Sequence, residues 1–151
     1  MSFDLNRFIK AQNTGYAGYE TALNEIQQGE KQGHWIWYIF PQLKQLGRSS
    51  TAQHYGINGI VEARAYWEDL TLRNRLLEIT QALLDLDEND PVRVLGHTDA
   101  MKVKSCMTLF LSIDPNNAVL QGVIDKFYSS KLDNHTIDIL EKERIETKEN
   151  L

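Results

Sequence analysis

Cysteine is almost absent from this chain, since Cys106 is the single thiol in 151 residues. A disulfide framework and a metal site of the paired-cysteine kind are therefore excluded. Cys106 lies on the apolar side of a predicted helix, which indicates a buried and inert thiol. A lone thiol is typical of a reducing compartment, and the N-terminal segment lacks the basic and then apolar layout of a signal peptide. We therefore expect a cytoplasmic protein.

Long hydrophobic runs are also missing. The longest one, Trp35 to Pro41, is far shorter than the roughly 20 apolar residues of a membrane-spanning helix, so we expect no membrane association. Basic residues are outnumbered by acidic ones, 16 against 21, and the net charge is −5. Because nucleic-acid backbones attract an excess of positive charge, this balance disfavours a nucleic-acid partner. Any anion-binding site therefore has to be local.

Acidic residues are missing from one long stretch. Glu30 and Glu62 are separated by 31 positions without Asp or Glu, where the average acid content of the chain would place roughly four. Two of the three tryptophans lie in this stretch, within the segment from Gly33 to Leu43. The chain is acidic overall but keeps negative charge away from one aromatic segment, which indicates a pocket that accepts an anion.

Helical periodicity is what the chain has in abundance. Hydrophobic residues make up 42% and charged residues 25%, as in ordinary globular proteins, and the length suits one core. Trp35 to Phe40 is apolar all round, and a helix is favoured there because no second strand-like segment exists to pair with it. The clearest helix is predicted where apolar residues step by 4, 3, 4 and 3, at Leu72, Leu76, Ile79, Leu83 and Leu86.

We therefore predict an all-α fold, a single compact domain of about seven to nine short helices over residues 1–140 that is not a regular four-helix bundle. Asp90-Pro91 and Thr98 are the expected starts of two helices. The charged residues 141–151 are predicted to form a frayed C-terminal helix. The four histidines, at positions 34, 54, 97 and 135, lack metal-ligand spacing, so neither a metal site nor a cofactor is expected.

The aromatic segment has two interpretations. Trp35 and Trp37 supply large apolar area that any core would bury, which is the simpler interpretation. Alternatively, one of these indoles forms a pocket wall and stacks on a ligand ring, with His34 and Gln42 as polar groups beside it.

The turn around Arg48 also has two interpretations. A hydroxyl of Ser49, Ser50 or Thr51 is expected to cap the helix that follows. The first backbone N–H groups of that helix, together with Arg48, then form an anion cradle. The other interpretation is a capped turn with a solvated arginine.

A second acid-free segment runs from Ala100 to Ile113. On a helical wheel Lys104, Ser105 and Thr108 share a narrow polar stripe, and Lys102 lies at its edge. Such a stripe either lines a cavity, where the lysines bind phosphate, or sends the lysines to water while the hydroxyls bond back to their own helix.

Three residues are candidates for acid–base chemistry, although known catalytic motifs are absent. They are His34, His54 and Glu62, the first acid after the acid-free stretch. Glu62 is a candidate general base if it is buried near a histidine. The alternatives for Glu62 are an ion pair with Arg48 and a surface charge. Whether the chain is an enzyme stays open.

Five short segments between about Asp4 and Leu140 form a series: His-Trp-x-Trp-x-x-Phe-Pro-Gln-Leu, Gly-Arg-Ser, Ala-Gln-x-Tyr, Glu-Ala-Arg-Ala-Tyr and Lys-x-x-Ser-x-Met-Thr-Leu-Phe. The series resembles a domain-of-unknown-function family of bacteria and fungi, whose members are often labelled "calpastatin". The resemblance implies a small all-α domain and no established activity. The label does not fit, because calpastatin-type inhibitors are extended disordered chains and this composition folds. Ala52-Gln53-His54-Tyr55 also loosely resembles a short motif of N-glycosidases that act on phosphorylated ribosyl compounds.

These features lead to two functional hypotheses. The first is a cytoplasmic domain that binds a small anionic ligand, such as a nucleotide or ribosyl phosphate, in a positively biased aromatic pocket, with or without acting on it. Trp35 or Trp37 would stack on the ligand, and Arg48 with Lys102 or Lys104 would hold phosphate. The alternative is a protein-interaction module without catalytic activity. A monomer or weak dimer is expected in either case.

Overall fold

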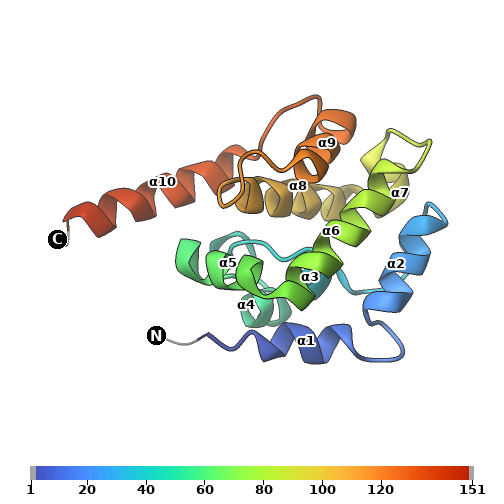
Figure 1. Ribbon diagram of the computed structural model, residues 1–151, viewed down its shortest axis with the longest axis horizontal. Coiled ribbons are helices and arrows are strands. Elements are labelled where there is room, and N and C mark those ends of the chain that lie inside the picture. The colour runs from blue at the N-terminus through green and yellow to red at the C-terminus, as the bar shows by residue number, and fades with distance from the viewer. Residues whose placement is uncertain (1–2, 150–151) are drawn as a thin grey trace.

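The computed structural model describes residues 3–149, which form the all-α domain that the periodicity predicted (Figure 1). No residue in that range lies in a strand, and the nearest approach to one is a single bridge between Leu43 and Ile57. The same range contains ten α-helices and one 3-10 turn, slightly more than predicted, because each short helical segment forms a separate helix. Their bounds are α1 Asn6–Gln12, α2 Tyr19–Gln27, α3 Ile36–Ile39, η1 Lys44–Leu46, α4 Ser50–Tyr55, α5 Gly59–Glu68, α6 Leu70–Leu84, α7 Pro91–Leu95, α8 His97–Leu111, α9 Ala118–Phe127 and α10 Asn134–Glu149.

Two predicted helix starts can be compared with the structure. The start at Asp90-Pro91 is confirmed, and the Asp90 carboxylate accepts the backbone N–H of Val92 at 2.9 Å. The start at Thr98 is wrong, because α8 already begins at His97. Gly96, with a φ of +84°, adopts a conformation that favours glycine and turns the chain directly from α7 into α8.

The long helices α6 and α8 organise the domain. α6 packs against α2, α5 and α9, and α8 packs against α7, α9 and α10. α1 packs on α3, α3 packs on α4, and α4 contacts η1. α10 reaches away from the body and is helical through Glu149, and the last two residues of the predicted 141–151 extension lie outside the described residues (Figure 1). None of the helices within residues 3–149 combines the length and hydrophobicity needed to cross a bilayer.

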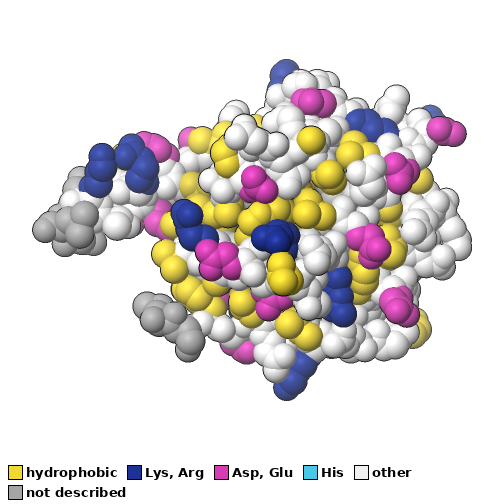
Figure 2. All heavy atoms as spheres, in the orientation of Figure 1, with side chains coloured by type: hydrophobic (Ala, Val, Ile, Leu, Met, Phe, Trp, Pro, Cys, Tyr) yellow, Lys and Arg dark blue, Asp and Glu magenta, His cyan; other side chains and the backbone are white. Residues whose placement is uncertain are grey.

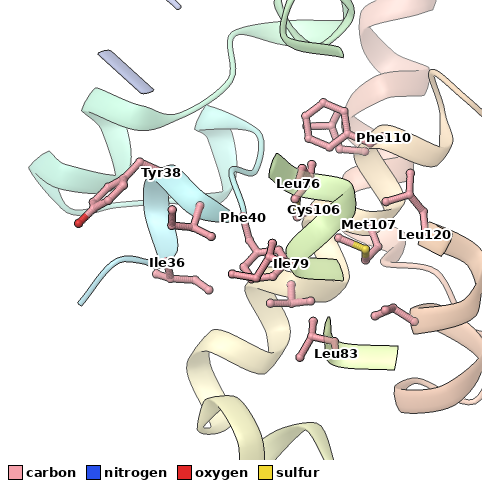
Figure 3. Packing of buried hydrophobic residues seen from close by; sticks show 14 of the residues in the cluster. Ile36, Tyr38, Phe40, Leu76, Ile79, Leu83, Cys106, Met107, Phe110 and Leu120 are labelled. Carbon is pink, nitrogen blue, oxygen red and sulfur yellow. The ribbon is translucent and has the colours of Figure 1, made fainter. Parts of the chain in front are cut away.

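In the segment from Trp35 to Phe40, residues Ile36–Ile39 form the short helix α3, and every side chain except the half-buried Trp37 lies in the core. Figure 3 shows side chains of α3, α6, α8 and α9 meeting in one apolar cluster. The Tyr38 hydroxyl points away from this cluster and donates to the carbonyl oxygen of Ala17 at 2.6 Å. The prediction of a buried Cys106 is confirmed, and burial raises the pKa of its thiol well above the ordinary value.

Candidate functional site

Three of the predicted ligand-binding residues meet at one small hollow. Trp37 comes from α3, Gln42 from the turn after it, and Lys102 from α8, while Tyr55 of α4 completes the rim. The Lys102 ammonium lies 5.1 Å from the centroid of the Trp37 ring, which is close enough for a cation–π contact. The hollow has a volume of about 10 Å³, enough for about one water molecule. We call it the Trp37–Lys102 hollow.

Backbone contacts bring Gln42 to this place. The N–H of Ile57 donates to the carbonyl oxygen of Gln42, and the N–H of Lys44 donates to the carbonyl oxygen of Ile57, each at 2.9 Å. Gly56 permits this close approach, because a Cβ there would lie 2.5 Å from the Cα of Lys44. The bridge therefore holds Gln42 beside the C-terminal end of α4, where Tyr55 lies.

Two lysines share one carboxylate beside the hollow. Nζ of Lys31 lies 2.8 Å from Oδ2 of Asp99, and Nζ of Lys102 lies 3.7 Å from Oδ1 of the same residue. Lys31 also lies over the ring of Trp35, with its Nζ 4.8 Å from the centroid. Glu25, whose pKa the charge of Lys31 helps to lower, is a second carboxylate beside this pair, so two lysines and two carboxylates leave the cluster without net charge. Positive charge for an anion at the hollow therefore has to come from Lys102, the lysine that lies farther from the shared carboxylate.

Trp35 belongs to the core and not to the hollow. Its side chain is fully buried, and its indole N–H donates to Oε1 of Glu25 at 2.9 Å. The same oxygen accepts the backbone N–H groups of Gln32 and Gly33 at 2.7 and 2.9 Å. Burial alone would raise the pKa of Glu25, but these donors outweigh it and lower that pKa. Trp37, which is half-buried, is the indole that a ligand can reach.

The polar stripe of α8 holds α10 in place. Ser105 Oγ lies 3.1 Å from both the carbonyl oxygen of Met101 and Oδ2 of Asp133, so its proton is shared between these acceptors. Thr108 Oγ1 donates to the carbonyl oxygen of Lys104 at 2.8 Å and accepts the N–H of Asp133 at 2.9 Å. Ser105 and Thr108 are therefore engaged and buried, and neither they nor the half-buried Lys104 side chain line the Trp37–Lys102 hollow.

Arg48 and His34 are exposed and also lie outside the lining of the hollow. Ser49 caps α4 as expected, with its Oγ accepting the N–H of Ala52 at 3.1 Å. α4 has only 6 residues, so its N-terminus carries little dipole. Arg48 has no carboxylate within ion-pair distance in the described part of the chain. These contacts favour the interpretation as a capped turn with a solvated arginine.

Glu62 is held by Arg7 and not by Arg48. The guanidinium donates from Nη1 to Oε2 and from Nη2 to Oε1 of Glu62, each at 3.0 Å. Arg7 also donates to the backbone carbonyl oxygens of His54 and Gly56, so His54 joins the network through its backbone and not its imidazole. The Glu62 side chain is 3% exposed. A carboxylate held on both oxygens fits a structural role better than that of a general base.

A larger polar cleft lies where α1, α2 and α6 meet, and none of its residues stood among the sequence candidates. Its volume is about 560 Å³, and its charged lining residues are Glu20, Arg75 and Glu78. The pattern of α6 marks Arg75 and Glu78 only as solvent-side residues of an amphipathic helix. Their meeting with α1 depends on the loop between α1 and α2, whose Gly15 and Gly18 indicate a turn but do not show where the chain leads afterwards.

An apolar groove lies between α5 and α10. It has a volume of about 510 Å³, and its apolar lining comes from Ile60, Ile137 and Leu140. Val61 and Ile145, on the same two helices, are exposed. Across residues 3–149, no three His, Cys, Asp or Glu side chains group closely enough to hold a metal ion.

Comparison with known proteins supports the fold. A family model described as "Protein of unknown function (DUF1810)" matches residues 2–140. Among solved structures, the chain is similar to the crystal structure of the conserved hypothetical protein Rv1873 from Mycobacterium tuberculosis. The sequence identity is 35% and the TM-score 0.87, and the match covers 92% of this chain and 97% of the other. The search among curated proteins gave no match.

Proposed function

Since the chain belongs to the family described as a protein of unknown function (DUF1810), we propose its function from its own side chains: it binds a small anionic ligand at the Trp37–Lys102 hollow. The observation that carries this proposal is the Lys102 ammonium 5.1 Å from the centroid of a half-buried indole. The lysine supplies charge for a phosphate or carboxylate, and Trp37 supplies a face for a ring. A nucleotide or ribosyl phosphate combines the anionic group with a ring.

Ligand entry requires Lys102 to move, because the hollow has room for about one water molecule. The 3.7 Å separation of Lys102 from Asp99 exceeds the 2.8 Å separation of Lys31 from the same carboxylate, so Lys102 is the more weakly held cation. Its flexible stem lets a phosphate draw the ammonium off the ring. The indole face then becomes free for stacking, while Gln42 and Tyr55 supply hydrogen-bonding groups at the rim.

We propose binding and not catalysis. Glu62 is engaged by Arg7 on both oxygens, and His34 lies outside the lining of the hollow. His54 is the acid–base candidate closest to the hollow, because its ring packs edge-on against Tyr55 with centroids 4.6 Å apart. It is the residue to replace first in any later search for activity.

A thermal-shift titration tests the proposal. AMP, ADP-ribose, ribose 5-phosphate and inorganic phosphate serve as ligands, and binding to the native state raises the Tm. AMP and ADP-ribose are expected to stabilise most, because only they offer a base to Trp37. Lys102→Ala and Trp37→Ala are each expected to weaken AMP binding by about tenfold or more. Lys104→Ala, which removes a lysine of the same helix from outside the hollow, is the matched control.

Two outcomes contradict the proposal. One is that none of the four ligands raises the Tm of the unaltered protein. The other is that Lys102→Ala keeps the full ligand-induced shift, measured against its own ligand-free Tm. If Lys104→Ala loses the ligand-induced Tm shift and Lys102→Ala keeps it, the anion binds near Lys104 and not at the hollow.

The apolar groove between α5 and α10 favours a second candidate function, a protein-interaction module. Ile60 and Leu140 line it, and acids and bases alternate along α10 from Glu141 to Lys148, so bases of one copy can face acids of a second copy. Sedimentation over a range of protein concentrations tests this candidate. A dimer that Ile60→Asp dissociates supports it, and a monomer at every concentration removes it.

A further inference from the structure

We infer that the polar cleft between α1, α2 and α6 is a second binding site, which takes a small zwitterion such as a free α-amino acid. Its volume of about 560 Å³ falls within the roughly 300–1,000 Å³ typical of small-molecule sites. It is formed by the C-terminal end of α1, the loop that follows, the first turns of α2 and the middle of α6. It shares no lining residue with the Trp37–Lys102 hollow.

Arg75 brings a positive charge to this cleft without a carboxylate partner. Its guanidinium donates to Oε1 of Gln12 at 3.1 Å and to Oδ1 of Asn13 at 3.0 Å, which are both neutral amide oxygens. It also lies over the ring of Tyr19, 5.5 Å from the centroid. No Asp or Glu within residues 3–149 comes within 4.0 Å of it. Neutral groups thus fix the orientation of Arg75 and leave its charge for a ligand carboxylate.

Glu78 brings a negative charge one turn further along α6. The Tyr19 hydroxyl donates to its Oε1 at 2.5 Å, and no basic side chain of the described residues pairs with it. Burial, followed by the hydrogen bond to Glu78, raises the pKa of Tyr19, so the hydroxyl stays protonated and remains a donor. Arg and Glu three positions apart on a helix are close enough to pair with each other. Here neutral side chains hold each of them, and both line one cleft.

Gly18 fixes the loop that closes the cleft. A Cβ at this position would lie 2.1 Å from the carbonyl oxygen of Thr14 and 2.6 Å from that of Gln12, so the tight return of the chain requires glycine. Gly18 is also the N-cap of α2 and offers no side chain to the first N–H groups of that helix.

The charges of the lining select a dipolar ligand. Glu20 and Glu78 together would repel a phosphate, and Arg75 would repel a plain cation. A zwitterion can pair with both charges of the lining, with its carboxylate at Arg75 and its ammonium at Glu78. Figure 2 shows basic and acidic side chains both reaching the surface over the part of the molecule where α1, α2 and α6 meet. The rest of the cleft, along Leu23 and the Tyr19 ring, accommodates an amino-acid side chain.

Amide-resolved NMR titration tests this inference. The free L-α-amino acids are added one at a time, and each binder is compared with its carboxamide and its N-acetyl derivative. A free amino acid is expected to shift the amide signals of Asn13, Thr14 and Thr21, and both derivatives are expected to bind at least about tenfold more weakly. Arg75→Gln and Glu78→Gln are expected to weaken binding to a similar extent. Arg73→Gln, on the same helix but outside the cleft, should bind normally.

Three results would overturn the inference. No amino acid shifts the cleft amides at millimolar concentration, or a carboxamide binds as tightly as its parent acid, or the shifts centre on Trp37 and Lys102. Glu78→Gln keeps an oxygen that accepts from Tyr19, so it separates loss of charge from loss of structure. AMP binding at the Trp37–Lys102 hollow is measured in the same spectra, so either site can fail while the other holds.

Discussion

Arg7 and Glu62, 55 positions apart, form a two-point ion pair in which both N–O distances are 3.0 Å. Their side chains are 11% and 3% exposed. Removing one partner of such a pair leaves the other charge buried and unpaired. The pair ties the first helix to α5 and to the end of α4.

Glu62→Ala is therefore expected to lower the free energy of unfolding by about 3–5 kcal/mol, as measured by urea denaturation. Glu141→Ala is the control, because Glu141 pairs with Arg144 on the surface, where both side chains are 54% exposed. That change should cost less than about 1 kcal/mol. Equal costs for the two variants would contradict the structural role of Glu62.

Trp35 is the N-cap of α3 and Trp37 lies within the helix, and replacing each by alanine should destabilise the protein to a different extent. Trp35→Ala is expected to cost about 3–5 kcal/mol, because it removes a fully buried indole and the donor to Glu25. Trp37→Ala should cost clearly less, since Trp37 is half-buried. Acrylamide quenching gives an independent check: Trp37→Phe should remove most of the quenchable emission, and Trp35→Phe should leave it. Strong quenching of Trp35 would be incompatible with its burial.

The all-α fold was predictable because apolar residues repeat at helical spacing, as in α6. This spacing identifies the buried face of a helix without knowledge of the residues that pack against it. Trp37, Gln42 and Lys102 were found as separate candidates, because their residue types favour anion and ring binding. Their convergence was not predictable from local patterns, since it depends on the bridge between Leu43 and Ile57 and on the packing that brings Lys102 of α8 against Trp37 of α3.

The polar stripe of α8 shows where sequence reasoning fails. A helical wheel places Ser105 and Thr108 on one face but does not show what covers that face. The residue that covers it is Asp133, which lies 28 positions after Ser105 and 25 positions after Thr108. Arg75 was missed for the same reason. Its partners Gln12 and Asn13 lie more than 60 positions earlier, and nothing local distinguishes it from a solvated arginine.

Asp133 should prove essential for the seating of α10. Its Oδ2 accepts the N–H of Thr136 at 3.0 Å and the Thr136 hydroxyl at 2.6 Å, in addition to Ser105. Asp133→Ala is expected to cost about 1–3 kcal/mol and to speed amide hydrogen exchange in the first turns of α10. Asp138→Ala, on the exposed face of the same helix, should change neither.

Cys106 should react only when the domain opens. Its thiol is fully buried and burial raises its pKa, so little thiolate is present or reachable in the native state. Labelling with a thiol-reactive disulfide is expected to be slow in buffer and to accelerate with urea in step with unfolding. Rapid stoichiometric labelling of the native protein would show that an opening of α8 exposes this part of the core.

Glu25 should make the loop before α3 sensitive to acid. Its folded-state pKa is lowered, so its contribution to stability is fully present above the unfolded-state pKa and disappears as the pH falls through the folded-state value. The unaltered protein should therefore be more stable than Glu25→Gln at neutral pH, and the difference should shrink as the pH falls below about 4.5. The indole N–H signal of Trp35 should shift over the same range, because Glu25 accepts that proton.

Glu30→Gln removes an exposed carboxylate from the same loop and is the control. If the stability difference between the unaltered protein and Glu25→Gln stays constant with pH, the carboxylate charge is not what holds Trp35 in the core.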